Sequence, residues 1–229
     1  MWKLIKLEWK KNNIIKYVRN AAIVTAVLLF FVISAARELE MTASAEDNGK
    51  ALLNMAVGLF VHISYIVFTG VMLASFVVGA YEKKTINLMF SYPISRQKIL
   101  LSKVFAVWIF NFIAMVAGKL VIYGALLLTR PLTHITAAGI RFGSLSFWVE
   151  ILIESAAMVS ISYIALPIGL AMKSSKAAIV ASVIIACFTQ GNIGSFTLVN
   201  NLFFYAVLFV AAVLSVYLAV RDVEVKDLL

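Results

Sequence analysis

The sequence is poor in the residues that many catalytic and metal-binding sites use. It has one cysteine, Cys187, and two histidines, His62 and His134. A single cysteine excludes an internal disulfide, and no Cys or His pair has the spacing of a zinc site. Neither histidine lies in an HExxH motif. We therefore expect Cys187 to be a small apolar core residue and both histidines to be structural.

Charged residues are also scarce. They make up 14% of the chain, whereas 63% of the residues are hydrophobic and the mean hydropathy is +0.99. Soluble domains are about 45 to 50% apolar, so this composition indicates an integral membrane protein. A helix needs about 20 apolar residues to cross a bilayer core. The chain can supply several such helices, and little is left for a soluble catalytic domain.

A phosphate-binding loop of the GxxxxGK[ST] type is absent from the sequence. Gly118 and Lys119 are adjacent, but they lie in an apolar run and Leu120 follows the lysine. We expect no enzyme activity and no cofactor bound by this chain. Basic residues among aromatics near the N-terminus suit lipid headgroups better than nucleic acid.

The apolar runs predict an all-α integral membrane protein with a single transmembrane domain, 1–229. We expect six membrane helices, with ends accurate to about two to four residues. They lie near Ala21–Ala36, Ala51–Ala80, Val104–Thr129, Phe147–Met172, Ser174–Thr189 and Leu202–Val220.

Three further elements are predicted around these helices. Residues 1–19 mix basic residues with Trp and Leu, which is typical of an interfacial helix. Residues 190–201 begin with a polar, glycine-containing stretch, which indicates a re-entrant or external element. Ala178, Ser182 and Ala186 recur every four residues, so another helix could pack closely against this side of the fifth span.

The basic residues predict the orientation. With both termini in the cytoplasm, fifteen Lys and Arg residues lie inside and four lie in outer loops, and Lys119 is within a span. Cytoplasmic segments carry the excess of Lys and Arg in membrane proteins. The sequence therefore predicts that both termini are cytoplasmic.

Three ionisable residues fall within the predicted spans: Lys119 in the third, and Glu150 and Glu154 in the outer part of the fourth. A charge near the bilayer centre costs about 2.5 to 3.5 kcal/mol and needs a partner or a cavity. Since one outer loop joins these two spans, we expect Lys119 to pair with Glu154. The pair could be structural, or the three residues could contact a substrate.

The segment 81–103 is basic and amphipathic and lies between the second and third spans. It holds Glu82, Thr85 and a hydrophobic run into Pro93, followed by Arg96, Lys98 and Lys103. This pattern resembles the cytoplasmic coupling loop of ABC-2 type transporter permeases. The six spans, the N-terminal surface helix and the element at 190–201 also resemble that family in plan, although Lys84 replaces the glycine usual before the threonine.

The resemblance implies the membrane subunit of an ATP-driven exporter in the bacterial cytoplasmic membrane. Its partners would be separate ABC ATPase subunits, which bind ATP, and a second permease protomer, identical or related. The small size resembles permeases that export peptide antibiotics or protect against bacteriocins, although another amphiphile would also fit. The alternative is a stand-alone scaffold or ion-coupled carrier without an ATPase, in which Lys119, Glu150 and Glu154 are the coupling residues.

Overall fold

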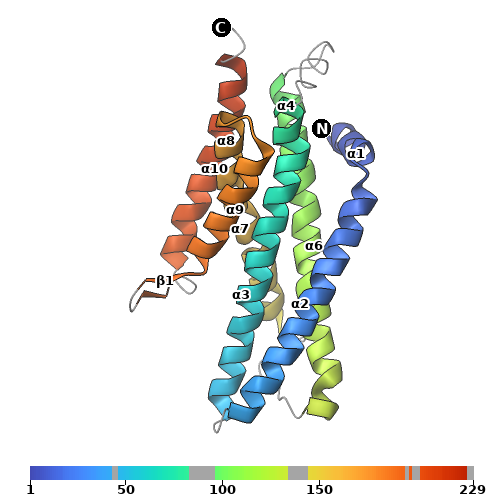
Figure 1. The fold of residues 1–229 in the computed structure, drawn as a ribbon, viewed down its shortest axis with the longest axis vertical. Coiled ribbons are helices and arrows are strands. Elements are labelled where there is room, and N and C mark those ends of the chain that lie inside the picture. Colours follow the sequence, from blue (N-terminus) through green and yellow to red (C-terminus); the bar gives the residue numbers. More distant parts are fainter. Residues whose placement is uncertain (43–45, 83–95, 134–143, 194–195, 198–201, 226–229) are drawn as a thin grey trace.

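The computed structural model describes residues 1–42, 46–82, 96–133, 144–193, 196–197 and 202–225 (Figure 1). These residues are helical apart from short connections and one pair of two-residue strands. The long helices run along one axis. The N-terminus and the C-terminal end of α10 lie toward the same end of the bundle, which we call the terminus-bearing end (Figure 1). This arrangement agrees with a chain that crosses the membrane an even number of times.

In the described part of the chain, six apolar helical stretches make up the bundle, and α1 (Trp2–Lys11) precedes them. Four of the described helices are long and apolar enough to cross a membrane, at Ile14–Ala35, Met55–Glu82, Gln97–Leu128 and Leu145–Ala171. Two shorter apolar helices lie at Ser175–Thr189 and Tyr205–Arg221. The chain is therefore a multi-pass membrane protein.

The first two long stretches are joined near the opposite end of the bundle. They are α2 (Ile14–Thr42) and α3 (Glu46–Leu73). The second continues through a π-helical turn, η1 (Ala74–Val78), into the short α4 (Gly79–Glu82). The third stretch is α6 (Arg96–Thr133), which begins eight residues before the predicted span.

The fourth stretch bends at a proline. It consists of α7 (Leu145–Ile161), the 3₁₀ turn η2 (Ser162–Ile164) and α8 (Ala165–Ala171). Pro167 has no amide hydrogen and its ring crowds the carbonyl four residues earlier, which places the irregular turn where it is seen. The last two stretches are α9 (Ser175–Thr189) and α10 (Leu202–Val225).

The predicted interfacial helix 1–19 is shorter than expected. The helix α1 stops at Lys11, Asn13 adopts a left-handed φ of 51°, and α2 begins at Ile14. Asparagine tolerates this conformation better than most residues, so the chain turns there. Lys16 and Arg19 consequently belong to α2, and α1 runs away from the bundle axis (Figure 1).

The helices α3 and α9 pack closely along small side chains. A methyl group on Gly70 would overlap the side chain of Ser182, and one on Gly169 of α8 would lie 2.6 Å from Cβ of Ala178. Ala178, Ser182 and Ala186 are all fully buried. The stripe predicted on α9 is therefore a packing surface against α3 and α8.

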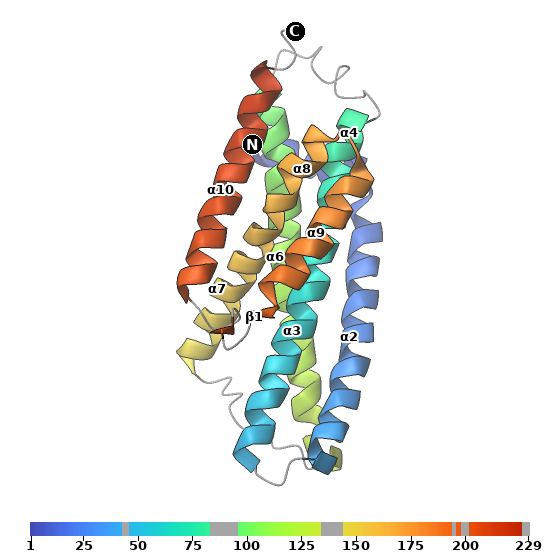
Figure 2. The same cartoon turned by 60° about the vertical axis from the view of Figure 1, so that its left-hand side comes forward.

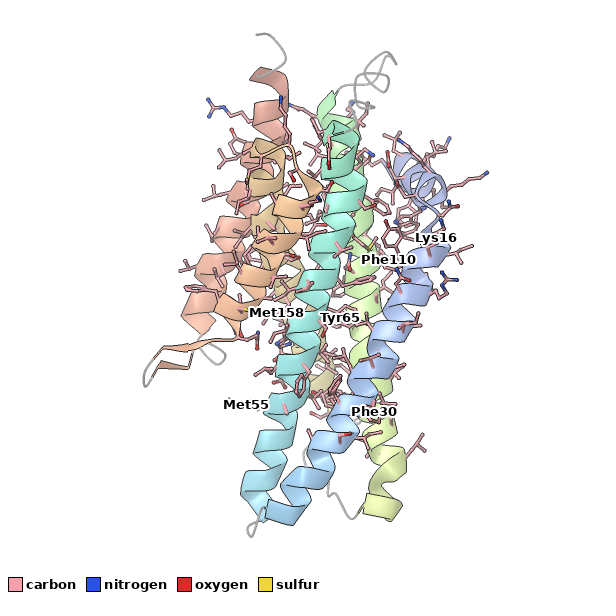
Figure 3. The ribbon with its side chains drawn as sticks, viewed as in Figure 1. Lys16, Phe30, Met55, Tyr65, Phe110 and Met158 are labelled. Carbon is pink, nitrogen blue, oxygen red and sulfur yellow. The ribbon has the colours of Figure 1, made fainter. Side chains whose placement is uncertain are left out.

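A tyrosine joins three helices in the core. The Tyr65 hydroxyl of α3 donates to the Ala114 carbonyl of α6 at 2.9 Å and lies 3.0 Å from the Thr25 hydroxyl of α2. Gly118 leaves room for the phenol, since a Cβ there would lie 2.5 Å from the Tyr65 oxygen. Figure 3 shows Tyr65 and Met158 between Lys16, near the terminus-bearing end, and Met55 toward the opposite end.

The connection after α9 begins as a short hairpin. Strand β1 (Asn192–Ile193) pairs antiparallel with β2 (Phe196–Thr197). It lies beside the bundle well short of the far ends of α2, α3 and α6 (Figures 1 and 2).

Cys187, one turn before the hairpin, is exposed, so the expectation that it is a core residue is wrong. Lipid and protein interiors are both apolar, and an apolar residue suits either.

We expect Gly70→Ala to destabilise the protein by about 1 to 3 kcal/mol, the usual cost of overpacking a tight contact. The added methyl would force α3 and α9 apart. Thermal unfolding in detergent, followed by size-exclusion chromatography, measures the change. Gly124→Ala is the matched control, because no atom lies within 4 Å of the methyl it would add. Adding Ser182→Gly to Gly70→Ala should restore stability, and equal loss in both glycine variants would contradict the close crossing.

Candidate functional site

Ionisable side chains from three helices meet within the membrane-spanning part. Nζ of Lys119 on α6 lies 2.7 Å from Oε2 of Glu154 on α7, so the expected ion pair is present. Nε2 of His62 on α3 lies 3.7 Å from the same carboxylate oxygen. We call His62, Lys119 and Glu154 the intramembrane cluster.

The cluster is closed on one side and open on the other. The side chains of Lys119 and His62 are 2% and 5% exposed, whereas that of Glu154 is 43% exposed. A charged group at membrane depth normally faces the bundle, a water-filled cavity or a partner. The Glu154 carboxylate therefore both neutralises Lys119 and offers a polar contact at the bundle surface.

Buried polar atoms without hydrogen bonds lie on the helices around this cluster. Among the described residues, both ring nitrogens of His62, the Ser155 hydroxyl and the side-chain amide of Gln190 have no hydrogen-bond partner. Ser155 is fully buried, and Gln190 is 8% exposed. Such groups normally have protein or water partners, so this level of the bundle can accept water or a polar ligand.

The packing of α3 against α9 brings Gln190 to the level of His62. The two helices are antiparallel, and Gly70 meets Ser182 at their crossing. Eight residues back along α3 lies His62, and eight residues forward along α9 lies Gln190. Equal helical rise on the two sides of the crossing therefore places both residues at one depth.

Glu150 does not join the cluster. It is exposed one turn before Glu154 on α7 and forms no hydrogen bond or ion pair with a described residue. No group of three His, Cys, Asp or Glu side chains among the described residues could hold a metal ion. The chemistry that the described cluster offers is hydrogen bonding and charge pairing.

At the terminus-bearing end, Glu82 caps α9. Its Oε2 accepts a 3.1 Å hydrogen bond from the Ser175 amide and a 2.6 Å bond from the Ser175 hydroxyl. The same hydroxyl lies 3.3 Å from the Ala74 carbonyl at the start of the π turn. A carboxylate is stabilised at the positive end of a helix. The second residue of segment 81–103 thus ties α4 to the beginning of α9.

Lys103 has a structural role in the described conformation. It lies on the second turn of α6, its side chain is 1% exposed, and its Nζ is 2.8 Å from Oε2 of Glu8 on α1. Next to it, Nε1 of Trp9 donates to the Ala106 carbonyl at 3.0 Å. These two contacts hold α1 against α6, so Lys103 is a docking residue for α1 and does not lie in a loop.

The other residues of the predicted coupling loop lie partly outside the described residues and partly at the start of α6. Thr85 and Pro93 lie outside the described residues. Arg96 is the first residue of α6, and Lys98 follows on its first turn with an exposed side chain. Lys98 forms no hydrogen bond or ion pair within the described part of the chain.

Sequence reasoning missed three members of these sites. His62 was interpreted as structural, and Glu8 and Gln190 were not singled out. A signal for Gln190 was present, because it ends the small-residue stripe of α9 and therefore follows the helix face that packs on α3. The sequence signal for Glu8 was weaker: it is the single acidic residue among the basic residues of 1–19.

The chain is similar to a protein of Bacillus subtilis (strain 168) named "Uncharacterized protein YcbO". The two are 25% identical over 227 residues, which is 98% of this chain and 99% of that protein. No family model matches the sequence, and no solved structure matches it significantly. The similarity therefore extends over the whole membrane domain and is not confined to one motif.

We expect Glu154→Gln to destabilise the protein, because it leaves Lys119 without a counter-charge inside the membrane-spanning part. An unpaired lysine near the centre of a span costs about 2.5 to 3.5 kcal/mol on insertion scales. The thermal midpoint in detergent and the amount of protein in the membrane measure the loss. Adding Lys119→Met should recover most of it.

Glu150→Gln is the matched control and should have little effect, since Glu150 is exposed and unpaired among the described residues. A double variant, Lys119→Met with Glu154→Gln, that is less stable than Glu154→Gln alone would show that the ion pair is not the reason for the loss.

Proposed function

We propose that this protein is the permease subunit of an ATP-driven ABC exporter in the bacterial cytoplasmic membrane. Six helices span the membrane, with both termini in the cytoplasm, and α1 lies in the inner headgroup region. The chain works with separate ATPase subunits and a second permease protomer. The observation that carries the proposal is the sequence pattern of segment 81–103, which connects α4 to the beginning of α6 at the terminus-bearing end of a multi-pass bundle.

The charge distribution supports this orientation. With six spans, fifteen of the twenty Lys and Arg residues would fall on the side of the two termini, as the positive-inside rule requires for a cytoplasmic face. One of the six apolar stretches is short: α9 has 15 residues, a rise of about 22 Å against a bilayer core of about 30 Å. The hairpin after α9 would then lie at or within the outer membrane face, which agrees with an element that re-enters the bilayer.

The Glu82 cap gives the segment a mechanical connection to the bundle. A push on residues that follow Glu82 acts on α4 and α3 directly and on α9 through Ser175, because Glu82 binds both the amide and the hydroxyl of that residue. The small-residue packing of α3 on α9 would make the two helices move together. ATP binding on the partner subunits would supply the energy, and this chain would convert it into a change of access.

The intramembrane cluster is the proposed substrate contact. A peptide antibiotic, a bacteriocin or another amphiphile has apolar surface for the bundle and polar groups that need partners at membrane depth. Glu154, half-exposed, and His62, whose ring nitrogens have no hydrogen bond among the described residues, supply such partners. Glu150 lies one turn farther along the same helix face and would extend the contact outward.

A second candidate function is an ion-coupled carrier that needs no ATPase. One observation favours it: His62 has two ring nitrogens without hydrogen bonds and lies 3.7 Å from a carboxylate that is already paired with a lysine. Proton binding at this cluster would then replace ATP as the energy source. The two functions differ in whether transport requires a nucleotide-binding partner.

The first test is the ATPase activity that co-purifies with the tagged chain, expressed from its native gene neighbourhood and extracted gently. We expect hydrolysis with the parent, and loss of the partner and of hydrolysis with Arg96→Glu plus Lys98→Glu. Reversed charges at the start of α6 would repel an acidic groove on the partner, where arginine forms strong charge-assisted hydrogen bonds.

Lys16→Glu plus Arg19→Glu is the matched control, because both residues are exposed near the terminus-bearing end of α2. It should keep the ATPase. If no ATPase co-purifies with the parent, the exporter proposal has no energy source and the ion-coupled carrier becomes the better proposal. If the two charge-reversal variants lose the ATPase to the same extent, the ATPase is held by non-specific attraction to basic residues. Segment 81–103 is then an ordinary basic loop.

A transport assay tests the role of the cluster. The double variant Lys119→Met plus Glu154→Gln removes both charges and should retain near-normal protein levels, whereas export or the protection that it gives should fall by at least about tenfold, equivalent to about 1.4 kcal/mol of lost interaction. Normal export at a normal protein level would assign the ion pair to stability alone.

A further inference from the structure

An apolar groove lies on the side of the bundle away from α1 and α2. Its volume is about 480 Å³, and α6, α7, η2 and α10 supply its walls. Ser160 and Tyr163 supply part of its lining, and both are already hydrogen-bonded, Ser160 to the Ala156 carbonyl and Tyr163 to the Val104 carbonyl. The lining therefore offers its occupant an almost wholly apolar surface.

The groove has the length of one lipid leaflet. It extends along α10 from Phe209 to Val220, a rise of about 16 Å. Half of a bilayer core is about 15 Å. Because α6 and α10 are apolar helices of the membrane bundle, an acyl chain can lie along the groove from the membrane surface to the bilayer midplane.

Two cations stand at the end of the groove nearest the terminus-bearing end. Lys98 lies one turn before Leu101 on α6, and Arg221 lies one turn beyond Tyr217 on α10, so each continues a wall of the groove. Both side chains are exposed, and neither forms a hydrogen bond or ion pair with a described residue. Figure 2 shows these ends of α6 and α10 beside each other.

We propose that this groove is a binding site for one anionic phospholipid. One acyl chain lies against Phe105, Trp108 and Val213, and the headgroup phosphate pairs with Lys98 and Arg221. The two cations sit where the apolar spans Gln97–Leu128 and Tyr205–Arg221 begin and end, which is the level of the headgroups. The site is separate from the intramembrane cluster, and it shares Lys98 with the contact proposed for the ATPase partner.

A second copy of the chain fits the groove less well than a lipid does. Two copies related by an axis along the membrane normal present the same end of the groove to each other. Lys98 and Arg221 of one copy would then approach Lys98 and Arg221 of the other, and like charges oppose such a contact. An anionic lipid neutralises both residues.

Native mass spectrometry tests the proposal. Purified protein in detergent is mixed with equal amounts of phosphatidylglycerol and phosphatidylethanolamine, and the retained lipids are counted. We expect one phosphatidylglycerol per chain. Lys98→Gln plus Arg221→Gln should weaken its retention about fivefold for each charge removed. Val213→Trp should displace it, because Val213 lines the groove and is itself exposed, so a larger side chain fills the groove without disturbing the core.

The controls are Lys16→Gln plus Arg19→Gln for charge and Val210→Trp for bulk, since Val210 is exposed on α10 outside the groove. Both should retain the lipid. Equal retention of the two phospholipids in parent and charge variant, or equal loss in the controls, would overturn the proposal. So would a native dimer that Val213→Trp converts to monomers while phosphatidylglycerol stays bound, because the groove would then be a contact between copies.

Discussion

The close crossing of α3 and α9 is the constraint on which most of the structure depends. Gly70 has no side chain, so Ser182 can pack directly against the α3 backbone. In lipid there is no hydrophobic force between helices, and close van der Waals packing takes its place. This contact fixes the register of two antiparallel helices. It brings Glu82 to Ser175 on one side of the crossing and His62 to the level of Gln190 on the other.

Other contacts hold the remaining helices together. The helices α3 and α9 are joined by packing and by the Glu82 cap, and α1 is attached to α6 by Glu8, Lys103 and Trp9. Tyr65 connects α3 to α2 and α6 near the middle. The intramembrane cluster draws its residues from α3, α6 and α7, so relative movement of these helices would change the contacts of Glu154.

Hydropathy predicted where the helices lie because the length of an apolar run depends on bilayer thickness and needs no knowledge of packing. The Lys119–Glu154 pair was also predictable, since two costly charges on adjacent spans have few other partners. His62 and Gln190 were not, because their common depth follows from a helix crossing between distant parts of the chain. Cys187 was misplaced for a related reason: a span has apolar residues on every side, and the sequence does not mark which side meets lipid.

The π turn at Ala74–Val78 has a consequence for how the chain tolerates changes in length. A π turn holds one residue more than an α turn, and each helical residue rotates the chain by about 100°. Removing a single residue there would leave the helix unbroken and its hydropathy unchanged. It would nevertheless turn Glu82 by more than a quarter of a revolution, away from Ser175. The alignment between this end of α3 and the beginning of α9 therefore depends on residue count, and a deletion harmless to membrane insertion would separate them.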